Sequence, residues 1–521
     1  MTAYTVLTQK EWGTPALEIL MRAFYSIALI TGIVIMNVHG IAVPAIAYKA
    51  SPASFVILLA VLFALKLRAK KPTLAPCVFS YLWRYQMKYS PDAYLLHESS
   101  RFITFNIRVK VVMKDPVAPD VLKAAAEKAF ARFPYYSKQI HIDEQGGIDL
   151  IPNPRTIRVN PVCAKRTYLF SKEVNYQPCS IEYEGNDIYF NMYHGMCGGC
   201  GTFLWVKTTV YEYICARYGV QPFPGSTIMT DTPVLEAEYA FPKQEDLPDD
   251  APIGKLKKDE AWFPGLEYLL GFGNLVFSDS VHYEFQIPKK NLMKYVSEND
   301  GSPMSVIAAI MAKALYRALP KNELPLRIET NHNYRAEVGC PQTHHDLLSH
   351  VFCLLPHRAK DWPIDKICTI IRGATFLQCQ PEYGYETLRR FYAYTDGVDQ
   401  IVGLKNKNKY ASKYSHRVPD VHNSFLINYV GREDWGEMTE YVERAHIITD
   451  AHLLFEILDV GDNFCITLMQ MNRKTMYMDQ FCRILEEENI PYKVLGMFKN
   501  HLPISKIAHA PNAELVESKS S

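Results

Sequence analysis

Hydrophobic and polar positions follow the periods of strands and helices from residue 73 onward. Between Phe102 and Met113, apolar side chains occupy every second position, which is the period of a half-buried strand. From Asp120 to Pro134 the apolar positions recur every three or four residues, as on one face of a helix. A second strand signal, Ile188 to Met192, runs into a glycine-rich turn and another helical pattern. This alternation predicts a mixed α/β (α+β) enzyme fold.

The second half of the chain repeats the pattern after a polar stretch. Residues 232–262 are rich in Asp, Glu, Pro and Lys, which is typical of a solvated linker or crossover between two lobes. A strand, VHYEFQIP, then precedes a helical pattern that ends at Pro320. Two further apolar runs flank residues 461–463 and predict a hairpin with a three-residue turn. A last helix is expected over residues 477–488.

The first seventy residues have a different composition. An uncharged stretch from Ala23 to Tyr48 exceeds the roughly 20 residues that a helix needs to cross a bilayer. A second uncharged stretch, Ala50 to Leu65, is shorter than a usual span. Basic residues flank both, so the positive-inside tendency predicts a transmembrane hairpin with both ends in the cytoplasm. The alternative is one span and an interfacial or core helix, in which case the remaining chain could lie on the other face.

These patterns divide the 521-residue chain into four parts. We expect a membrane anchor over residues 1–72, an N-terminal lobe over 73–245, a C-terminal lobe over 246–500 and a disordered polar tail over 501–521. The length is sufficient for two lobes of ordinary domain size with a large buried core.

Charge and cysteine usage exclude some classes of function. The 56 basic and 55 acidic residues give a net charge of +1, which provides no field to attract nucleic acid. We therefore expect no nucleic-acid partner. The twelve cysteines lack the dense spacing of a small secreted domain, so they predict reduced thiols in a cytosol-like compartment.

The main chemical candidate is His194, at the predicted strand end in NMYHGMCGGCG. A neutral imidazole titrates in the range needed to take a proton from an attacking hydroxyl or amine. A lone histidine at a strand end is, however, more often a hydrogen-bonded structural residue than a catalyst. Both interpretations are open from the residues alone.

The same region offers two rival interpretations. His194, Cys197 and Cys200 have spacings that zinc tolerates, and a fourth ligand could come from the cluster of His344, His345 and His350. Structural zinc sites usually carry a second close pair of ligands, and none is evident in the sequence, so no metal is expected. Cys197 or Cys200 could also be a nucleophile, although cysteine is often only a small apolar filler.

The segment around His194 resembles the signature of the acyltransferase superfamily that includes chloramphenicol acetyltransferase, nonribosomal-peptide condensation domains, polyketide-associated acyltransferases and alcohol acetyltransferases. That signature is a histidine, three variable residues, an aspartate and a glycine. Here Gly198 stands in the place of the aspartate and is followed by Gly199. Other segments resemble the same superfamily in the same order between about Leu82 and Pro491. They are SPDAYLLHES, PDVLKAAAEKAFARFPYYSKQI and SPMSVIAAIMAKALYRALP.

Two more segments extend the resemblance. NHNYRAEVGCP is similar to the segment that supplies an arginine, here Arg335, to the signature aspartate. FLINYVG is similar to the Asn-x-x-Gly segment of the alcohol acetyltransferase-like branch, here Asn428 and Gly431. The Asp-Phe-Gly-Trp-Gly motif of the plant-type members is absent from the sequence. The resemblance therefore favours that branch and assigns structural support of the site to Gly198, Gly199, Arg335, Asn428 and Gly431.

The resemblance implies a two-lobed chloramphenicol acetyltransferase-like fold with a central tunnel, in which His194 is the general base. It implies acyl-CoA as co-substrate, no bound cofactor, and transfer of an acyl group, such as acetyl, to a hydroxyl or an amine. The membrane anchor suggests an amphipathic or lipid-like acceptor and a catalytic domain facing the cytoplasm. With Gly198 in the signature, Arg335 would lack its usual partner, which suggests a non-catalytic binding or scaffold relative as an alternative. A condensation-type enzyme that uses carrier-protein thioesters is a further alternative.

Overall fold

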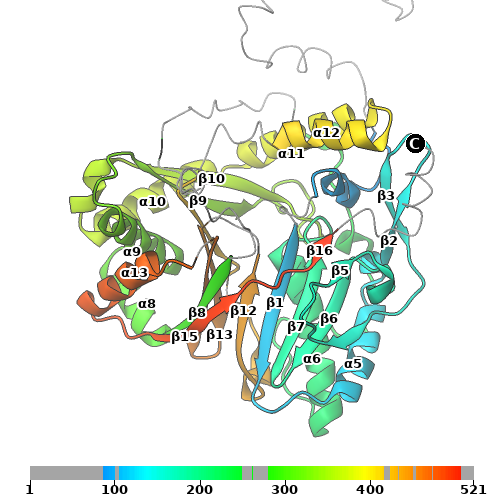
Figure 1. Ribbon diagram of the computed structural model, residues 1–521, viewed down its shortest axis with the longest axis horizontal. Coiled ribbons are helices and arrows are strands. Elements are labelled where there is room, and N and C mark those ends of the chain that lie inside the picture. The colour runs from blue at the N-terminus through cyan, green and yellow to red at the C-terminus, as the bar shows by residue number, and fades with distance from the viewer. Residues whose placement is uncertain are drawn as a thin grey trace, which may run out of the picture. The chain divides into compact units, whose positions relative to one another are not determined.

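The structure, a computed structural model, describes residues 86–99, 105–248, 261, 280–415, 423–431, 433–449, 453–471 and 473–505. The predicted membrane anchor over residues 1–72 lies outside these residues. Within the described ranges, no helix is both long enough and apolar enough to cross a membrane. The described chain has the predicted mixed α/β, two-lobed architecture, built around two sheets (Figure 1).

The first sheet combines strands from distant parts of the sequence. Among the described residues its order is β12 (Val442–Ile448), β1 (Asn106–Met113), β7 (Asp187–Tyr193), β6 (Cys179–Glu184) and β4 (Val159–Pro161). Helices α5 (Pro119–Ala131) and α6 (Gly199–Tyr218) pack together, and their apolar side chains share one core with those of β1 and β7. Because β12 pairs with β1, residues of both predicted lobes build this sheet.

Strand β1 is buried along its whole length, although its alternating pattern predicted a half-buried strand. Its polar residues Arg108 and Lys110 are only 4% and 5% exposed. Arg108 pairs with Glu182 at 2.9 Å, and Lys110 pairs with Glu284 of the second sheet at 3.1 Å. The prediction of a solvated face is wrong because the second sheet covers this face and supplies a partner charge.

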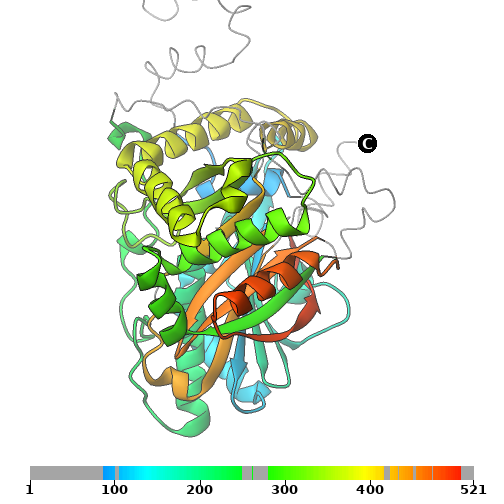
Figure 2. The ribbon, with the colours of Figure 1, turned by 90° about the vertical axis from the view of Figure 1, so that its left-hand side faces the viewer.

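The second sheet forms the other lobe. Within the described chain its order is β10 (Leu348–Leu355), β9 (Leu326–Asn333), β11 (Phe425–Tyr429), β13 (Leu453–Val460), β14 (Asn463–Gln470), β8 (Val281–Pro288) and β15 (Lys493–Lys499). Its core is shared with α8 (Lys289–Glu298), α9 (Pro303–Ala318), α10 (Ile364–Gln378) and α13 (Met476–Glu487) (Figure 2). The predicted β13–β14 hairpin is confirmed, but its turn has two residues because Val460 pairs with Asn463.

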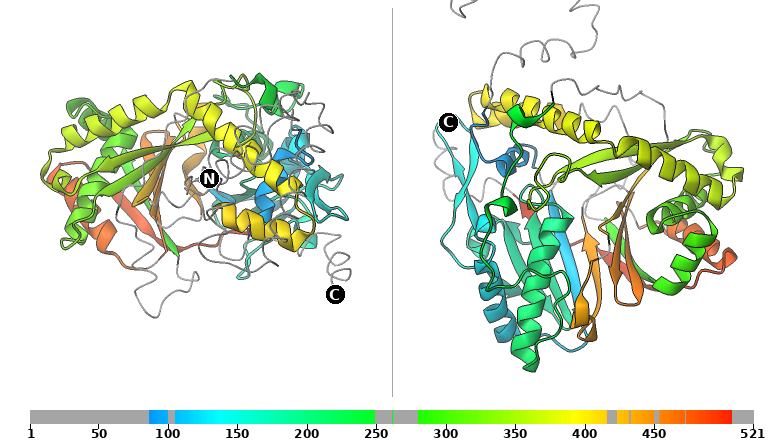
Figure 3. Two further views of the ribbon diagram at one scale, coloured as in Figure 1. Left: turned by 90° about the horizontal axis from the view of Figure 1, so that it is seen from above. Right: turned by 180° about the vertical axis from the view of Figure 1, so that it is seen from behind.

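Helices α11 (Pro381–Asp399) and α12 (Leu404–Ser415) contact the first described element, the 3-10 helix η1 (Pro91–His97) (Figure 3). The Tyr94 hydroxyl donates to Asp399 at 2.9 Å, and the Tyr394 hydroxyl donates to the Tyr94 carbonyl oxygen at 3.1 Å. The smaller elements are η2 (Pro134–Tyr136), β2 (Lys138–Ile142), β3 (Ile148–Pro152), β5 (Tyr168–Leu169), η3 (Lys172–Val174), η4 (Glu236–Glu238), η5 (Gln244–Asp246), η7 (His357–Asp361), η9 (Gly436–Glu440) and β16 (Ile504–Ser505).

Most of the described residues of the expected linker are exposed as predicted, with Glu238 among the buried exceptions, whereas the start of the expected tail is packed. In the expected linker, Glu238 is 6% exposed and pairs with Arg132 at 2.7 Å. In the expected disordered tail, β16 pairs with β5, and Asn106 donates to the Pro503 carbonyl oxygen at 2.7 Å. The tail prediction is therefore wrong for residues 501–505, because their polar backbone groups find partners in the first lobe. Residues 506–521 lie outside the described chain.

Candidate active site

His194 lies directly after β7, on the turn that leads into α6. Its backbone N–H donates to the Phe105 carbonyl oxygen at 2.7 Å, and the Met196 N–H donates to the Tyr193 carbonyl oxygen at 3.0 Å. Gly198 then caps α6 and accepts from the Thr202 N–H at 3.0 Å. The His194 side chain is 32% exposed, whereas the strand before it is buried. The predicted strand-to-helix turn thus presents the imidazole on a fixed backbone.

Asp346 is the carboxylate that faces this imidazole. One of its oxygens, Oδ2, lies 3.2 Å from His194 Nδ1. Asp346 belongs to the loop between β9 and β10 and is not among the candidate residues predicted from the sequence. The only local signal is an acidic residue next to two histidines in THHDLL, and that pattern has no spacing that would connect it to His194.

Gly198 makes room for Asp346. A Cβ atom built on Gly198 would lie 2.3 Å from the Oδ1 atom of Asp346 and 3.0 Å from its Cγ. The φ of Gly198 is −80°, an ordinary value for any residue. The glycine is therefore explained by the carboxylate beside it, which arrives from another element and takes the space of the aspartate that the resemblance expects at position 198.

Arg335 supports the loop that carries Asp346. This arginine is 3% exposed, and its guanidinium donates to the carbonyl oxygen of Thr343 at 3.0 Å, to that of His345, and to the Asn333 Oδ1 atom at 3.0 Å. Arg335 lacks the signature aspartate as expected, but its buried charge has other partners, because carbonyl and amide oxygens satisfy the guanidinium. These bonds fix the backbone on which Asp346 stands.

The segment from Asn428 to Gly431 lies beside the start of α6. A Cβ atom on Gly199 would meet the Val430 methyl groups at 3.6 Å, an ordinary contact, and Gly431 adopts a φ of +99°, which favours glycine. Asn428 donates to Glu456 at 3.0 Å and accepts from Asn331 at 3.1 Å. Burial raises the pKa of the Glu456 carboxyl to about 7.

Neither cysteine of the turn has the properties of a nucleophile. Cys197 is buried, its sulfur lies 3.3 Å from the Thr202 hydroxyl, and burial raises the pKa of its thiol to about 12. Burial also raises the pKa of the Cys200 thiol. Because the thiolate is the reactive form, both residues are better suited to packing than to catalysis.

The zinc ligands considered in the sequence analysis do not meet at His194. Among the residues that the structure describes, the one group with ligand-like geometry is Asp92, His344 and His345. His194, Cys197 and Cys200 are not part of it. His350 also lies apart and pairs with Glu329 at 2.7 Å.

The chain is similar to known proteins in its structure and not in its sequence. No protein-family model matches the chain, and no curated protein matches its sequence. The described architecture is similar to F. graminearum TRI101 complexed with coenzyme A and T-2 mycotoxin, with 11% identity, a TM-score of 0.49, and coverage of 78% of this chain and 99% of that one.

Two further solved structures are similar over comparable lengths. Polyketide synthase associated protein 5 from Mycobacterium tuberculosis has 12% identity, a TM-score of 0.45, and coverage of 77% of this chain and 96% of that one. The wax ester synthase/diacylglycerol acyltransferase from Marinobacter aquaeolei VT8 has 10% identity, a TM-score of 0.42, and coverage of 77% and 98%.

Proposed function

We propose that the chain is an acyl-CoA-dependent O-acyltransferase in which His194 is the general base. The observation that carries the proposal is the 3.2 Å approach of Asp346 Oδ2 to His194 Nδ1 on the turn after β7. A carboxylate beside Nδ1 favours the tautomer with its proton on that nitrogen. The lone pair of Nε2 is then available to an acceptor hydroxyl.

The proposed reaction needs no covalent enzyme intermediate. As the acceptor oxygen attacks the thioester carbonyl carbon, Nε2 takes its proton and the new C–O bond forms. The C–S bond then breaks, and the imidazolium returns the proton to the departing coenzyme A sulfur. The raised pKa values of the Cys197 and Cys200 thiols are consistent with this route, because the route uses neither thiol as a nucleophile. The tunnel that would admit both substrates stays a prediction.

The acceptor that we propose is an amphipathic or lipid-like alcohol at a membrane surface. The support is the uncharged stretch from Ala23 to Tyr48, which is long enough for a membrane span and would confine the active site near membrane-dissolved substrates. The flanking basic residues favour a catalytic part on the cytoplasmic side. Protease added outside sealed cells should leave the large domain intact, and its digestion there would refute this topology.

The test of the activity is an assay of free thiol released from acetyl-CoA and longer acyl-CoAs, with membrane-extract alcohols as acceptors and mass spectrometry of the products. His194→Ala should lower the rate by roughly a hundred- to ten-thousand-fold, with acyl-CoA binding little changed. His357→Ala is the matched control, because His357 lies on η7 and contacts Tyr316 and Lys360. Its rate should equal that of the wild type.

The non-catalytic alternative rests on the absence of the signature aspartate at Gly198. It loses weight because the Asp346 carboxylate lies beside His194 instead. The two functions separate in the same assay. Wild-type protein that binds no acyl-CoA, or that releases thiol at a rate indifferent to His194→Ala, would contradict the catalytic proposal and favour a binding or scaffold role.

A further inference from the structure

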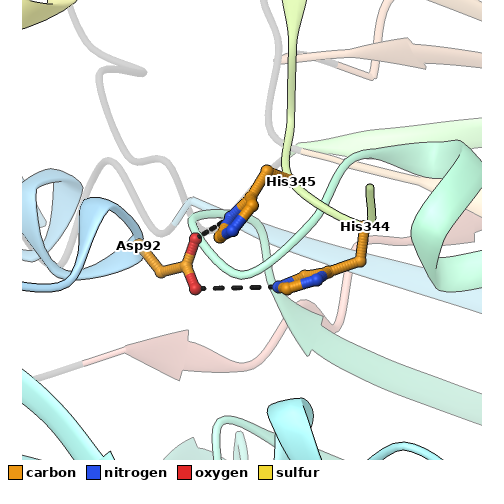
Figure 4. Close-up of side chains that lie close together, drawn as sticks. All are labelled: Asp92, His344 and His345. Carbon is orange, nitrogen blue, oxygen red and sulfur yellow. Dashed lines mark hydrogen bonds and ion pairs between the residues drawn. The ribbon is translucent and has the colours of Figure 1, made fainter. Parts of the chain in front are cut away.

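Three buried side chains meet close to the loop that carries Asp346. They are Asp92 on η1, with 7% exposure, and His344 and His345 on the β9–β10 loop, with 2% and 6% exposure. His345 Nδ1 lies 2.6 Å from one carboxylate oxygen of Asp92, and His344 Nε2 lies 3.7 Å from the other. Figure 4 shows both rings directed at the carboxylate. These residues form the Asp92–His344–His345 cluster.

The second nitrogen of each ring faces a backbone carbonyl oxygen. His344 Nδ1 lies 2.8 Å from the Glu238 carbonyl oxygen, and His345 Nε2 lies 3.3 Å from the Tyr239 carbonyl oxygen. A carbonyl oxygen only accepts, so His344 Nδ1 carries the proton and Nε2 presents a lone pair to Asp92. Metal-bound histidines have this arrangement, because they donate the other ring N–H to a carbonyl or carboxylate group.

Within the Asp92–His344–His345 cluster, the unsatisfied atom is His344 Nε2. It is buried, has no hydrogen-bond partner among the protein atoms, and faces a carboxylate oxygen, so two acceptors oppose each other. An unpaired polar atom in such a position costs free energy, and a cation between the two atoms would remove that cost.

We propose that the Asp92–His344–His345 cluster binds one divalent transition-metal ion, for which Zn²⁺ is the natural probe. Two imidazoles and a carboxylate are ligands that Zn²⁺ accepts. The three ligand atoms lie within 4.8 Å of one another. The 3.7 Å between His344 Nε2 and the Asp92 oxygen permits both atoms to lie about 2.0–2.2 Å from one ion. Binding would displace the proton on His345 Nδ1 to solvent.

The position of the site gives the ion a structural role. It would tie η1 to the β9–β10 loop at His345, whose neighbour Asp346 faces His194. Bonds within the same loop, from Arg335 to the carbonyl oxygens of Thr343 and His345, also hold it. We infer that the ion positions the loop and takes no part in the chemistry, so metal binding does not depend on the proposed activity.

The test is the zinc content of the full-length protein, freed of metal with a chelator, loaded with ZnCl₂ and dialysed against metal-free buffer. We expect one Zn²⁺ per chain by plasma mass spectrometry, and a rise in the melting temperature on loading. His344→Gln should lose the ion. His350→Gln is the matched control, because His350 lies on β10 and bonds to Glu329 outside the cluster.

Asp92→Asn serves as a second variant if His344→Gln does not fold, because it keeps the shape of the side chain while removing the charge. It should also lose the ion, whereas Cys197→Ser with Cys200→Ser should keep it. A wild-type chain that retains no zinc after loading would overturn the proposal. Full zinc content in His344→Gln or Asp92→Asn would overturn it as well, since the ion would then lie elsewhere.

Discussion

Gly198 and Asp346 share one space beside the candidate base. A Cβ atom at position 198 would lie 2.3 Å from Asp346 Oδ1, while Asp346 Oδ2 lies 3.2 Å from His194 Nδ1. A side chain on residue 198 and the carboxylate of Asp346 are therefore mutually exclusive in their present positions. The histidine keeps an acidic neighbour although the residue at position 198 is glycine.

Gly198→Asp should damage the protein instead of restoring the signature. The new side chain would push Asp346 away from His194 and place a second carboxylate beside the first. Overpacking of this kind costs about 1–3 kcal/mol, and the unpaired charge adds to that cost. We expect a lower free energy of unfolding, measured by chemical denaturation, together with at least a tenfold loss of acyl transfer.

The double variant Gly198→Asp with Asp346→Gly tests the same relationship from the other direction. Removing the Asp346 side chain frees the space for an aspartate at 198, so stability and part of the activity should return relative to Gly198→Asp alone. Gly373→Asp is the matched control, because a Cβ at Gly373 meets nothing within 4 Å. If Gly198→Asp lowered the free energy of unfolding no more than Gly373→Asp does, the steric exclusion between a side chain at 198 and Asp346 would be disproved.

Asp346→Asn should lower the rate without weakening the binding of acyl-CoA. The amide keeps the shape of the side chain but can present an N–H to His194 Nδ1, which favours the wrong tautomer of the imidazole. Because Asp346 acts through His194, the loss in kcat should not exceed the roughly 10²- to 10⁴-fold loss expected for the base itself. Steady-state kinetics should show KM for acyl-CoA near the wild-type value. A rise in KM with kcat unchanged would instead assign Asp346 to substrate binding.

The local part of the site could be predicted from the sequence. The period of residues 188–192 and the glycines that follow them indicate a strand, a turn and a helix, and that turn is where His194 stands. The hairpin at Gly461 was predictable for the same reason, because two strands joined by a short turn are neighbours in sequence as well as in space.

The contacts between distant segments could not be predicted in this way. Asp346 reaches His194 only because the β9–β10 loop folds against the end of β7, and no local period records that approach. The same holds for Lys110. The alternating pattern of its own strand predicts a solvated side chain, but this side chain pairs with Glu284 of another sheet. Alternation indicates which face of a strand is polar, but not whether a second polar surface covers that face.

The stability of the protein should depend on the pH through Glu456, which is 5% exposed. Burial raises the pKa of its carboxyl from 4.5 to about 7. The folded protein therefore prefers the neutral carboxyl, so the contribution of Glu456 to stability is complete below about pH 4.5 and is lost as the pH rises through 7. At 1.36 kcal/mol for each unit, the loss is at most roughly 3 kcal/mol.

Glu456→Gln should remove this dependence, because the amide oxygen can still accept from Asn428 while the side chain no longer ionises. Between about pH 5 and pH 8, the variant should therefore gain free energy of unfolding relative to the wild type, as followed by urea denaturation at both pH values. Glu298→Gln is the control, since its carboxylate is 56% exposed and pairs with Lys294 on the surface of α8. A wild-type difference between the two pH values that persists in Glu456→Gln would show that another buried group titrates in this range.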